Sequence, residues 1–246
     1  MNLFNKYLLL LLLPCSVSIA QTEGTTTNTA LKSSLHLSKA QAQNERVKFL
    51  LSVAQSYVNE NNMKAAVQAY ERVLSIDPEY TQARYIVGQL YITTKQYRKA
   101  EAMLLKLTTE FPEDFKLWNN LAWLYATADD PAIRSGKKAV KYAHEAMTLA
   151  PTDYHVWSTL SEAYYVSGDY EKAHRAILQM ASLAVRYGTD VTKESVQEYN
   201  QQILKCKRAL DTLESMESKD ETTNKKVPKK ELPKADTPKE KIKKTT

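Results

Sequence analysis

Apolar residues recur three and four positions apart along most of residues 47–187, which is the period of helices that bury one face. Each apolar stretch ends at a short polar turn or just before a proline, as at Pro78, Pro112 and Pro151. No segment shows the strict alternation of a half-buried strand. The pattern predicts an all-α chain built from short amphipathic helices.

The helical pattern repeats with a period of 34 residues. Pro78 and Pro112 are 34 residues apart, whereas Pro151 lies 39 residues further on, which is 34 plus five. Tyr125 and its counterpart in the next copy, Tyr164, are also 39 residues apart. Because the 34-residue spacing returns further along, the five extra residues must follow Tyr125, in a polar stretch that contains two aspartates and a proline.

Four copies of the pattern can be aligned. They span residues 47–80, 81–114, 115–153 with the five-residue insertion, and 154–187. The third copy has Trp118, Leu121, Ala122, Tyr125, Ala139 and Pro151 at its marker positions. These markers resemble the tetratricopeptide repeat, whose pattern is Trp-x2-Leu-Gly-x2-Tyr, then Ala, an aromatic residue and Pro. The resemblance implies a right-handed α-solenoid of four helix pairs, because one pair alone cannot bury its apolar stripe.

Both ends of the array continue the helical pattern. Ser38 starts the first helix early, so that it runs from Lys39 to Asn59 and the repeat domain covers residues 38–187. Residues 190–217 keep helical spacing, with Asp190 or Thr192 as the helix start. We expect this second segment to be a cap helix that covers the exposed apolar end of the last repeat.

Residues 1–20 have the features of a secretory signal peptide. A short basic start precedes six consecutive leucines, and Ser18 and Ala20 supply the small residues before a cleavage site. The apolar run is too short to span a bilayer, and Pro14 disfavours lipid attachment at Cys15, although a lipid anchor and an uncleaved anchor stay open. The sequence predicts cleavage after Ala20, export to the periplasm or outside the cell, a flexible leader over residues 21–37 and no transmembrane span after cleavage.

The formal net charge of +6 belongs to the ends of the chain. Residues 219–246 contribute +5 and Lys6 contributes +1, so residues 21–218 have no net charge. The Lys- and Pro-rich residues 218–246 contain too little apolar surface to fold, which predicts a disordered tail. The tail either serves solubility or tethers the protein to an anionic surface. A neutral body argues against a nucleic-acid partner.

No catalytic or metal-binding pattern occurs in the chain. The four histidines do not form His-Glu-x-x-His, and neither Gly-x-Ser-x-Gly nor a phosphate-binding glycine loop occurs. Asp129 and Asp130 lack a third spaced ligand. After signal removal Cys206 is the remaining cysteine, most simply a partly buried helical residue. We therefore expect no enzyme activity, no cofactor and no metal.

The resemblance also implies a binding surface. In this family the concave groove is formed by the first helix of each repeat, at its second, fifth, ninth and twelfth positions. The candidate protein-binding residues at these positions are Lys48, Leu51, Gln55, Tyr85, Gln89, Asn119, Trp123, His155, Ser158, Glu162 and Tyr165. Their large aromatic members suit anchors for a peptide, although packing between helices would explain Trp123 equally well.

These observations predict a non-enzymatic adaptor that binds a protein or peptide segment in the groove, in assembly of a cell-envelope complex. Chaperone-binding members of the family clamp a C-terminal carboxylate with Lys and Asn, but the corresponding residues here are Leu51 and Gln55. Two alternatives stay open: an envelope assembly factor tethered by its tail, and an architectural module that self-associates through its helical edges. The sequence identifies neither the partner nor the oligomeric state.

Overall fold

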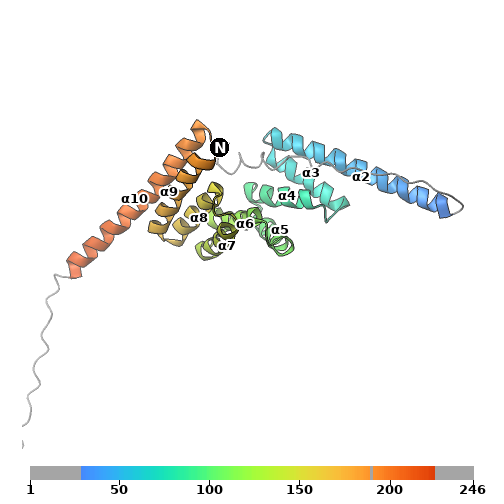
Figure 1. Cartoon of the computed structure of the whole chain (residues 1–246). Coiled ribbons are helices and arrows are strands. Elements are labelled where there is room, and N and C mark those ends of the chain that lie inside the picture. The colour runs from blue at the N-terminus through green and yellow to red at the C-terminus, as the bar shows by residue number, and fades with distance from the viewer. Residues whose placement is uncertain (1–28, 189–190, 225–246) are drawn as a thin grey trace, which may run out of the picture.

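The computed structural model describes residues 29–188 and 191–224, and all regular structure within them is α-helix (Figure 1). The helices are α2 (Thr29–Asn59), α3 (Met63–Ile76), α4 (Thr81–Thr93), α5 (Tyr97–Glu110), α6 (Phe115–Thr127), α7 (Gly136–Leu149), α8 (Tyr154–Ser167), α9 (Tyr170–Tyr187) and α10 (Lys193–Asn224). Consecutive helices pack into four pairs, and the pairs stack in chain order from α2 to α10. This is the all-α solenoid that the sequence predicts.

The turns within three of the pairs have the same geometry. Asn61, Lys95 and Gly168, which occupy equivalent positions, adopt positive φ angles of 59°, 61° and 84°. In each turn the next N–H donates a hydrogen bond to the carbonyl of the repeat's tyrosine, as Gln96 does to Tyr91 at 2.7 Å. The bond ends the first helix in a Schellman-type turn and directs the second helix back along it.

The insertion in the third pair lengthens the turn without changing its end points. α6 ends at Thr127, and the Ser135 N–H donates to the Tyr125 carbonyl at 2.9 Å, as in the shorter turns. Ser135 then caps α7, because its side chain accepts a hydrogen bond from the Lys138 N–H. Gly136 is required here because a Cβ atom would lie 2.6 Å from the Ser167 Cα atom of α8.

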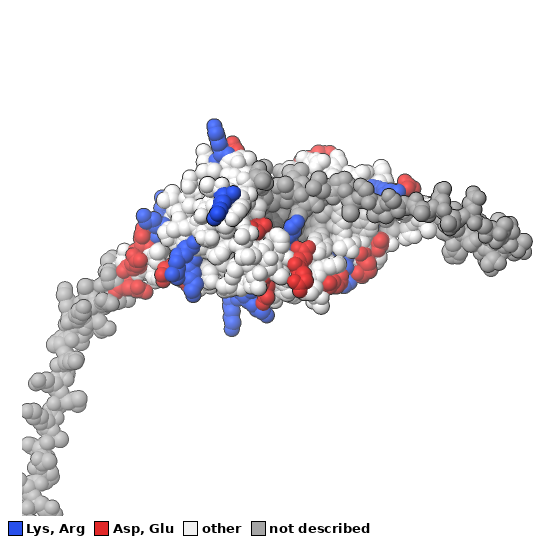
Figure 2. Space-filling model, viewed as in Figure 1, with Lys and Arg blue, Asp and Glu red and all other residues white. Residues whose placement is uncertain are grey.

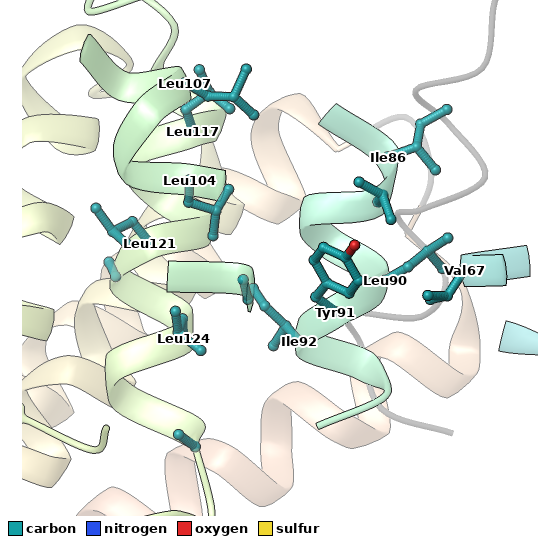
Figure 3. Packing of buried hydrophobic residues seen from close by; sticks show 14 of the residues in the cluster. Val67, Ile86, Leu90, Tyr91, Ile92, Leu104, Leu107, Leu117, Leu121 and Leu124 are labelled. Carbon is teal, nitrogen blue, oxygen red and sulfur yellow. The ribbon is translucent and has the colours of Figure 1, made fainter. Parts of the chain in front are cut away.

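Small residues allow the two helices of a pair to approach closely. Ala54 of α2, Ala66 of α3 and Ala100 of α5 are fully buried, and a Cβ atom on Gly88 of α4 would lie 3.4 Å from Leu104 Cδ2 of α5. Larger apolar residues fill the spaces between pairs, and Figure 3 shows leucines of α5 and α6 packed beside the apolar side chains of α4. One continuous core therefore joins the first three pairs to α8.

Tyrosines tie each pair to the one before it. The hydroxyl of Tyr91 donates to Glu71 Oε1 at 2.9 Å, and that of Tyr125 donates to Glu101 Oε1 at 2.6 Å. In the fourth pair the Tyr164 hydroxyl lies 2.8 Å from Nε2 of a histidine on α7. The rings of all three tyrosines lie within 6 Å of a lysine ammonium of their own repeat.

The two end helices are longer than the sequence analysis predicts. α2 begins at Thr29 rather than Lys39, so the second half of the proposed leader 21–37 is helical. α10 continues to Asn224, seven residues into the proposed tail. Neither extension contains proline or glycine, so no strong helix breaker ends α2 or α10 at the predicted bounds. The proposed signal peptide and the rest of the tail lie outside the described residues.

Thr192 caps α10, as one of the two predicted starts proposed. Its Oγ1 accepts a hydrogen bond from the Ser195 N–H at 3.2 Å, while Ser195 Oγ accepts from the Thr192 N–H at 2.7 Å. This reciprocal pair satisfies two backbone donors at the helix start. No helix in the described part of the chain combines the length and the hydropathy that crossing a membrane requires.

Candidate partner-binding face

The predicted binding residues all lie on the first helices of the four pairs. Three are on α2, two on α4, two on α6 and four on α8. All are partly exposed except Lys48, which is fully exposed. We call this surface of α2, α4, α6 and α8 the first-helix face.

On α8 the first-helix face is covered by the chain's own C-terminal helix. Ser158 Oγ donates to Gln202 Oε1 at 3.4 Å, and Lys205 Nζ donates to both carboxylate oxygens of Glu162 at 2.8 and 2.9 Å. The same ammonium lies 3.9 Å from the ring centroid of Tyr165, a close cation–π contact. The polar and aromatic groups of this part of the face therefore bind α10.

His155, the fourth candidate on α8, is held within its own turn. Its Nδ1 lies 3.1 Å from Asp153 Oδ1, and its ring lies 3.9 Å from that of Tyr154. Tyr154 in turn meets Tyr199 of α10 edge to face. Sequence reasoning identified the α8 residues but not their partners Gln202 and Lys205, because α10 is not a copy of the repeat and gives no spacing signal.

On α4, Tyr85 is hydrogen-bonded to the turn between α5 and α6 and still presents its ring. Its hydroxyl donates to Asp114 Oδ2 at 3.0 Å, and its ring packs edge to face with Phe111 at 5.8 Å. Burial, then the carboxylate of Asp114, raises the pKa of Tyr85, so the hydroxyl stays protonated and acts as a donor. Gln89, one helical turn further along α4, is partly exposed.

On α6 the two candidates combine a buried polar atom with an aromatic ring. The Oδ1 atom of Asn119 is shielded from solvent and finds no hydrogen-bond donor among the described residues. Trp123 packs against the main core and remains partly exposed. Trp123 thus packs between helices, which is one of the two interpretations drawn from the sequence. It also contributes to the surface.

On α2 the candidates are less constrained. Lys48 Nζ pairs with Glu45 at 3.1 Å on the helix surface, and Gln55 Nε2 donates to Asn59 at 2.9 Å. Leu51 packs against the core while remaining partly exposed. Exposed pairs of this kind contribute little to stability, so these side chains can rearrange around a ligand at small cost.

The described residues contain neither a metal-ligand cluster nor an accessible thiol. Among the residues that the structure describes, no three of His, Cys, Asp and Glu come together in a way that could hold a metal ion. Cys206 is 1% exposed with its sulfur 3.6 Å from Ser161 Oγ, and burial raises the pKa of its thiol. Figure 2 shows basic and acidic side chains interspersed over the helical body, with no continuous field of one sign on that face.

A family model and one curated protein match the chain. Residues 57–131 match the model described as tetratricopeptide repeat. Superkiller protein 3 of Schizosaccharomyces pombe is 21% identical over 150 residues, which are 58% of this chain and 11% of that protein. The chain thus spans about a tenth of the length of this curated relative.

Solved structures share the architecture. MamA of Desulfovibrio magneticus matches with a TM-score of 0.51 and 20% identity, covering 58% of this chain and 78% of that one. A thermophilic tetratricopeptide-repeat protein of Thermus thermophilus matches with a TM-score of 0.54 and 16% identity, covering 75% and 93%. At these identities the likeness shows the fold alone: the chain has the all-α solenoid fold that tetratricopeptide-repeat proteins have.

Proposed function

We propose that this chain is a non-enzymatic adaptor that binds a segment of another protein on the first-helix face of α2, α4 and α6. Tetratricopeptide-repeat proteins generally mediate protein–protein interaction. The observation that supports this surface is the difference between the repeats: α10 bonds Ser158 and Glu162 of α8, whereas the hydrogen bonds of Gln55 and Tyr85 go to their own helix or to the turn before α6. The proposed surface is therefore narrower than the four-repeat groove.

The side chains of this surface suggest a largely neutral segment. Tyr85 and Trp123 present aromatic area, which supplies most of the binding energy at typical interfaces. Gln55, Gln89 and Asn119 present amide groups, which suit the backbone N–H and C=O groups of an extended or helical peptide. The unpaired Asn119 oxygen would gain a hydrogen bond from a donor on the ligand.

The proposal places this adaptor in the cell envelope, on the strength of the signal-like residues 1–20. The partner would then belong to an exported complex. The excess positive charge beyond α10 favours an additional role for the tail, tethering to an anionic surface. Deleting residues 225–246 leaves α10 intact and is expected to release the protein from envelope membranes without loss of its protein partner.

The test is crosslinking capture from the protein's own envelope fraction with a substitution that leaves the core intact. Gln89→Arg places a long cation on α4 in the first-helix face, and Gln68→Arg makes the same change on an exposed site of α3. We expect Gln89→Arg to abolish capture of a partner that wild type and Gln68→Arg both retain. Equal capture by all three proteins would contradict the proposed surface.

A further inference from the structure

Three of the four first helices have one flank buried under the preceding pair. α3 packs on α4, α5 on α6, and α7 on α8. As a result the third and seventh residues of those three repeats are at most 2% exposed. These residues are Ala83, Val87, Leu117, Leu121, Val156 and Leu160.

The equivalent flank of α2 has no preceding pair within the described residues. Phe49 and Val53 occupy the same third and seventh positions, yet Phe49 is 66% exposed and Val53 is partly exposed. The Tyr91 hydroxyl donates a hydrogen bond to a glutamate of the preceding helix. The hydroxyl of Tyr57, at the equivalent position of the first repeat, has no hydrogen-bond partner among the described side chains. This flank therefore has the chemistry of an interface but no occupant among the residues that the structure describes.

Five residues form one stripe along this flank, which we call the α2 stripe. They are spaced three and four apart: Arg46, Phe49, Val53 and Ser56 share one side of α2, and Glu60 follows directly after the helix, where its N–H still donates to the Ser56 carbonyl at 2.9 Å. In chain order the stripe reads cation, large apolar, apolar, small, anion. Read backwards it reads anion, small, apolar, large apolar, cation, so the stripe is complementary to itself in the antiparallel direction.

We propose that this protein forms a symmetric dimer in which the α2 stripes of two copies pack antiparallel around a twofold axis near Val53. Arg46 then meets Glu60 of the second copy, Phe49 lies over Ser56 of the second copy, and the two Val53 side chains meet on the axis. A twofold interface uses the same patch on both copies, so each contact occurs twice. Small Ser56 leaves room for the Phe49 ring, as a knob enters a hole between facing helices.

The charges at the ends of the stripe are available for this contact. Neither Arg46 nor Glu60 takes part in an ion pair among the described residues, and one oxygen of Glu60 accepts only the Ser56 hydroxyl at 2.8 Å. At the opposite end of the solenoid the exposed residues of α10 are mixed, since apolar Val196 and Leu204 are 43% and 48% exposed beside the polar Gln197, Asn200 and Arg208. Phe49 is more exposed than either of these apolar residues.

The dimer does not rest on the proposed adaptor role. Lys48, Leu51 and Gln55 of the first-helix face are spaced along another side of α2, so both surfaces can be occupied at once. The contact is short, because the stripe covers 15 residues or about 22 Å of helix. We therefore expect a weak dimer that is sensitive to salt, since its ion pairs lie at the rim.

The test is sedimentation velocity of the full chain from about 1 to 200 µM, a range that brackets a weak interface. Wild type is expected to show a concentration-dependent dimer. Phe49→Glu is expected to raise the dissociation constant at least about ten-fold without lowering the melting temperature, because the side chain is a central anchor that is already exposed. Val185→Glu, which changes an 89% exposed residue of α9, is the control and should leave the dimer unchanged.

Charge reversal tests the register and the identity of the occupant. Arg46→Glu and Glu60→Arg should each weaken the dimer, and the double variant should restore it, because the reversed pair is complementary again. A wild type that stays monomeric throughout, or a dimer that Phe49→Glu leaves intact, overturns the proposal. If the double variant dimerises no better than the single variants, the antiparallel register is wrong. If the chain stays monomeric and binds another protein in a way that depends on Phe49, the stripe has a different occupant.

Discussion

At the scale of single residues, the same amino acid at equivalent repeat positions has different roles according to its neighbours. Tyr57 and Tyr91 both stand at the eleventh position of their repeats. The Tyr91 hydroxyl bonds Glu71 of the preceding helix, whereas no helix precedes the first repeat in the described chain to serve Tyr57. The repeat pattern conserves the residue type, but only the neighbouring pair makes it a connection between repeats.

Tyr91→Phe is therefore expected to lower the free energy of unfolding by about 1 kcal/mol, the usual net contribution of such a hydrogen bond. Tyr57→Phe removes a hydroxyl at the equivalent position and should change stability far less. Urea denaturation followed by circular dichroism measures both. Equal losses would show that the two hydroxyls have similar environments, against the arrangement described.

Aspartates at helix starts make stability depend on acid. Asp153 Oδ1 accepts the backbone N–H groups of His155 and Val156 at 2.9 and 3.4 Å. Burial acts to raise the pKa of Asp153, but bonds from the His155 side chain and from the backbone outweigh it, so the pKa lies below its usual value. The ionised carboxylate therefore stabilises the fold above the pKa of the unfolded chain, and this contribution is lost as pH falls through the lower pKa of the folded chain.

We expect the melting temperature to fall as pH drops below about 4, and to fall less steeply for Asp153→Asn. Asparagine keeps an oxygen that accepts the backbone bonds but has no charge to neutralise. Asp211→Asn, at an exposed site of α10, is the control and should follow wild type. Thermal melting followed by circular dichroism between pH 7 and pH 3 measures this difference. An equal fall in the melting temperatures of Asp153→Asn and wild type would contradict the role assigned to the Asp153 carboxylate.

At the scale of elements, α10 occupies the position that the first helix of a fifth repeat would have. Its contacts with α8 advance together along both helices, from Tyr154 with Tyr199 to Glu162 with Lys205, so the two helices run parallel. First helices of successive repeats are parallel in the same sense. A helix that is not a repeat copy thus covers the end of the stack, with an outward surface that is mostly polar and includes the half-exposed Leu204.

The contacts of Lys205 are expected to control access to Cys206. Lys205→Ala removes the ion pair with Glu162 and the contact with Tyr165, which loosens α10 on α8 and exposes the buried thiol more often. We expect faster alkylation of Cys206, measured by mass spectrometry of the labelled peptide at neutral pH. Lys207→Ala changes an exposed neighbour, so its Cys206 should be alkylated at the wild-type rate. Identical alkylation rates in all three proteins would show that the Lys205 contacts do not hold α10 on α8.

At the scale of the whole molecule, the array has one closed end and one open end. α10 covers a second apolar cluster that includes Ile177, Met180 and Leu183 of α9. At the other end Phe49 of α2 remains exposed. An end-capped stack can be soluble while still offering one flank for association.

Ending the chain at residue 188 removes α10 and is expected to lower the melting temperature and cause aggregation, because the second cluster is then exposed to water. Ending it at residue 217 keeps the packed part of α10 and should change neither property. Light scattering during thermal melting compares the two proteins. A chain ending at 188 that matches the longer one in both measurements would show that α10 is not needed as a cap.

The sequence by itself determined the solenoid, because its information is local and repeated. Spacings of three and four, a period of 34 and prolines at the helix ends each report on contacts within one repeat or between neighbours. Even the insertion after Tyr125 could be placed, since it shifts the period of everything that follows. The candidate first-helix residues came from the resemblance to the tetratricopeptide repeat, which implies groove positions within the 34-residue frame, and they lie on the first helices of the pairs.

Only the tertiary structure decided which candidate surfaces are occupied. α10 bonds Glu162 and Tyr165 through Lys205, a contact across 43 residues between segments that share no pattern. Likewise, the period marks Phe49 as equivalent to the buried Leu117, and only the absence of a preceding pair in the described chain leaves it exposed. Periodicity records what a residue contacts inside an ideal array, whereas burial at the ends depends on which segment lies there.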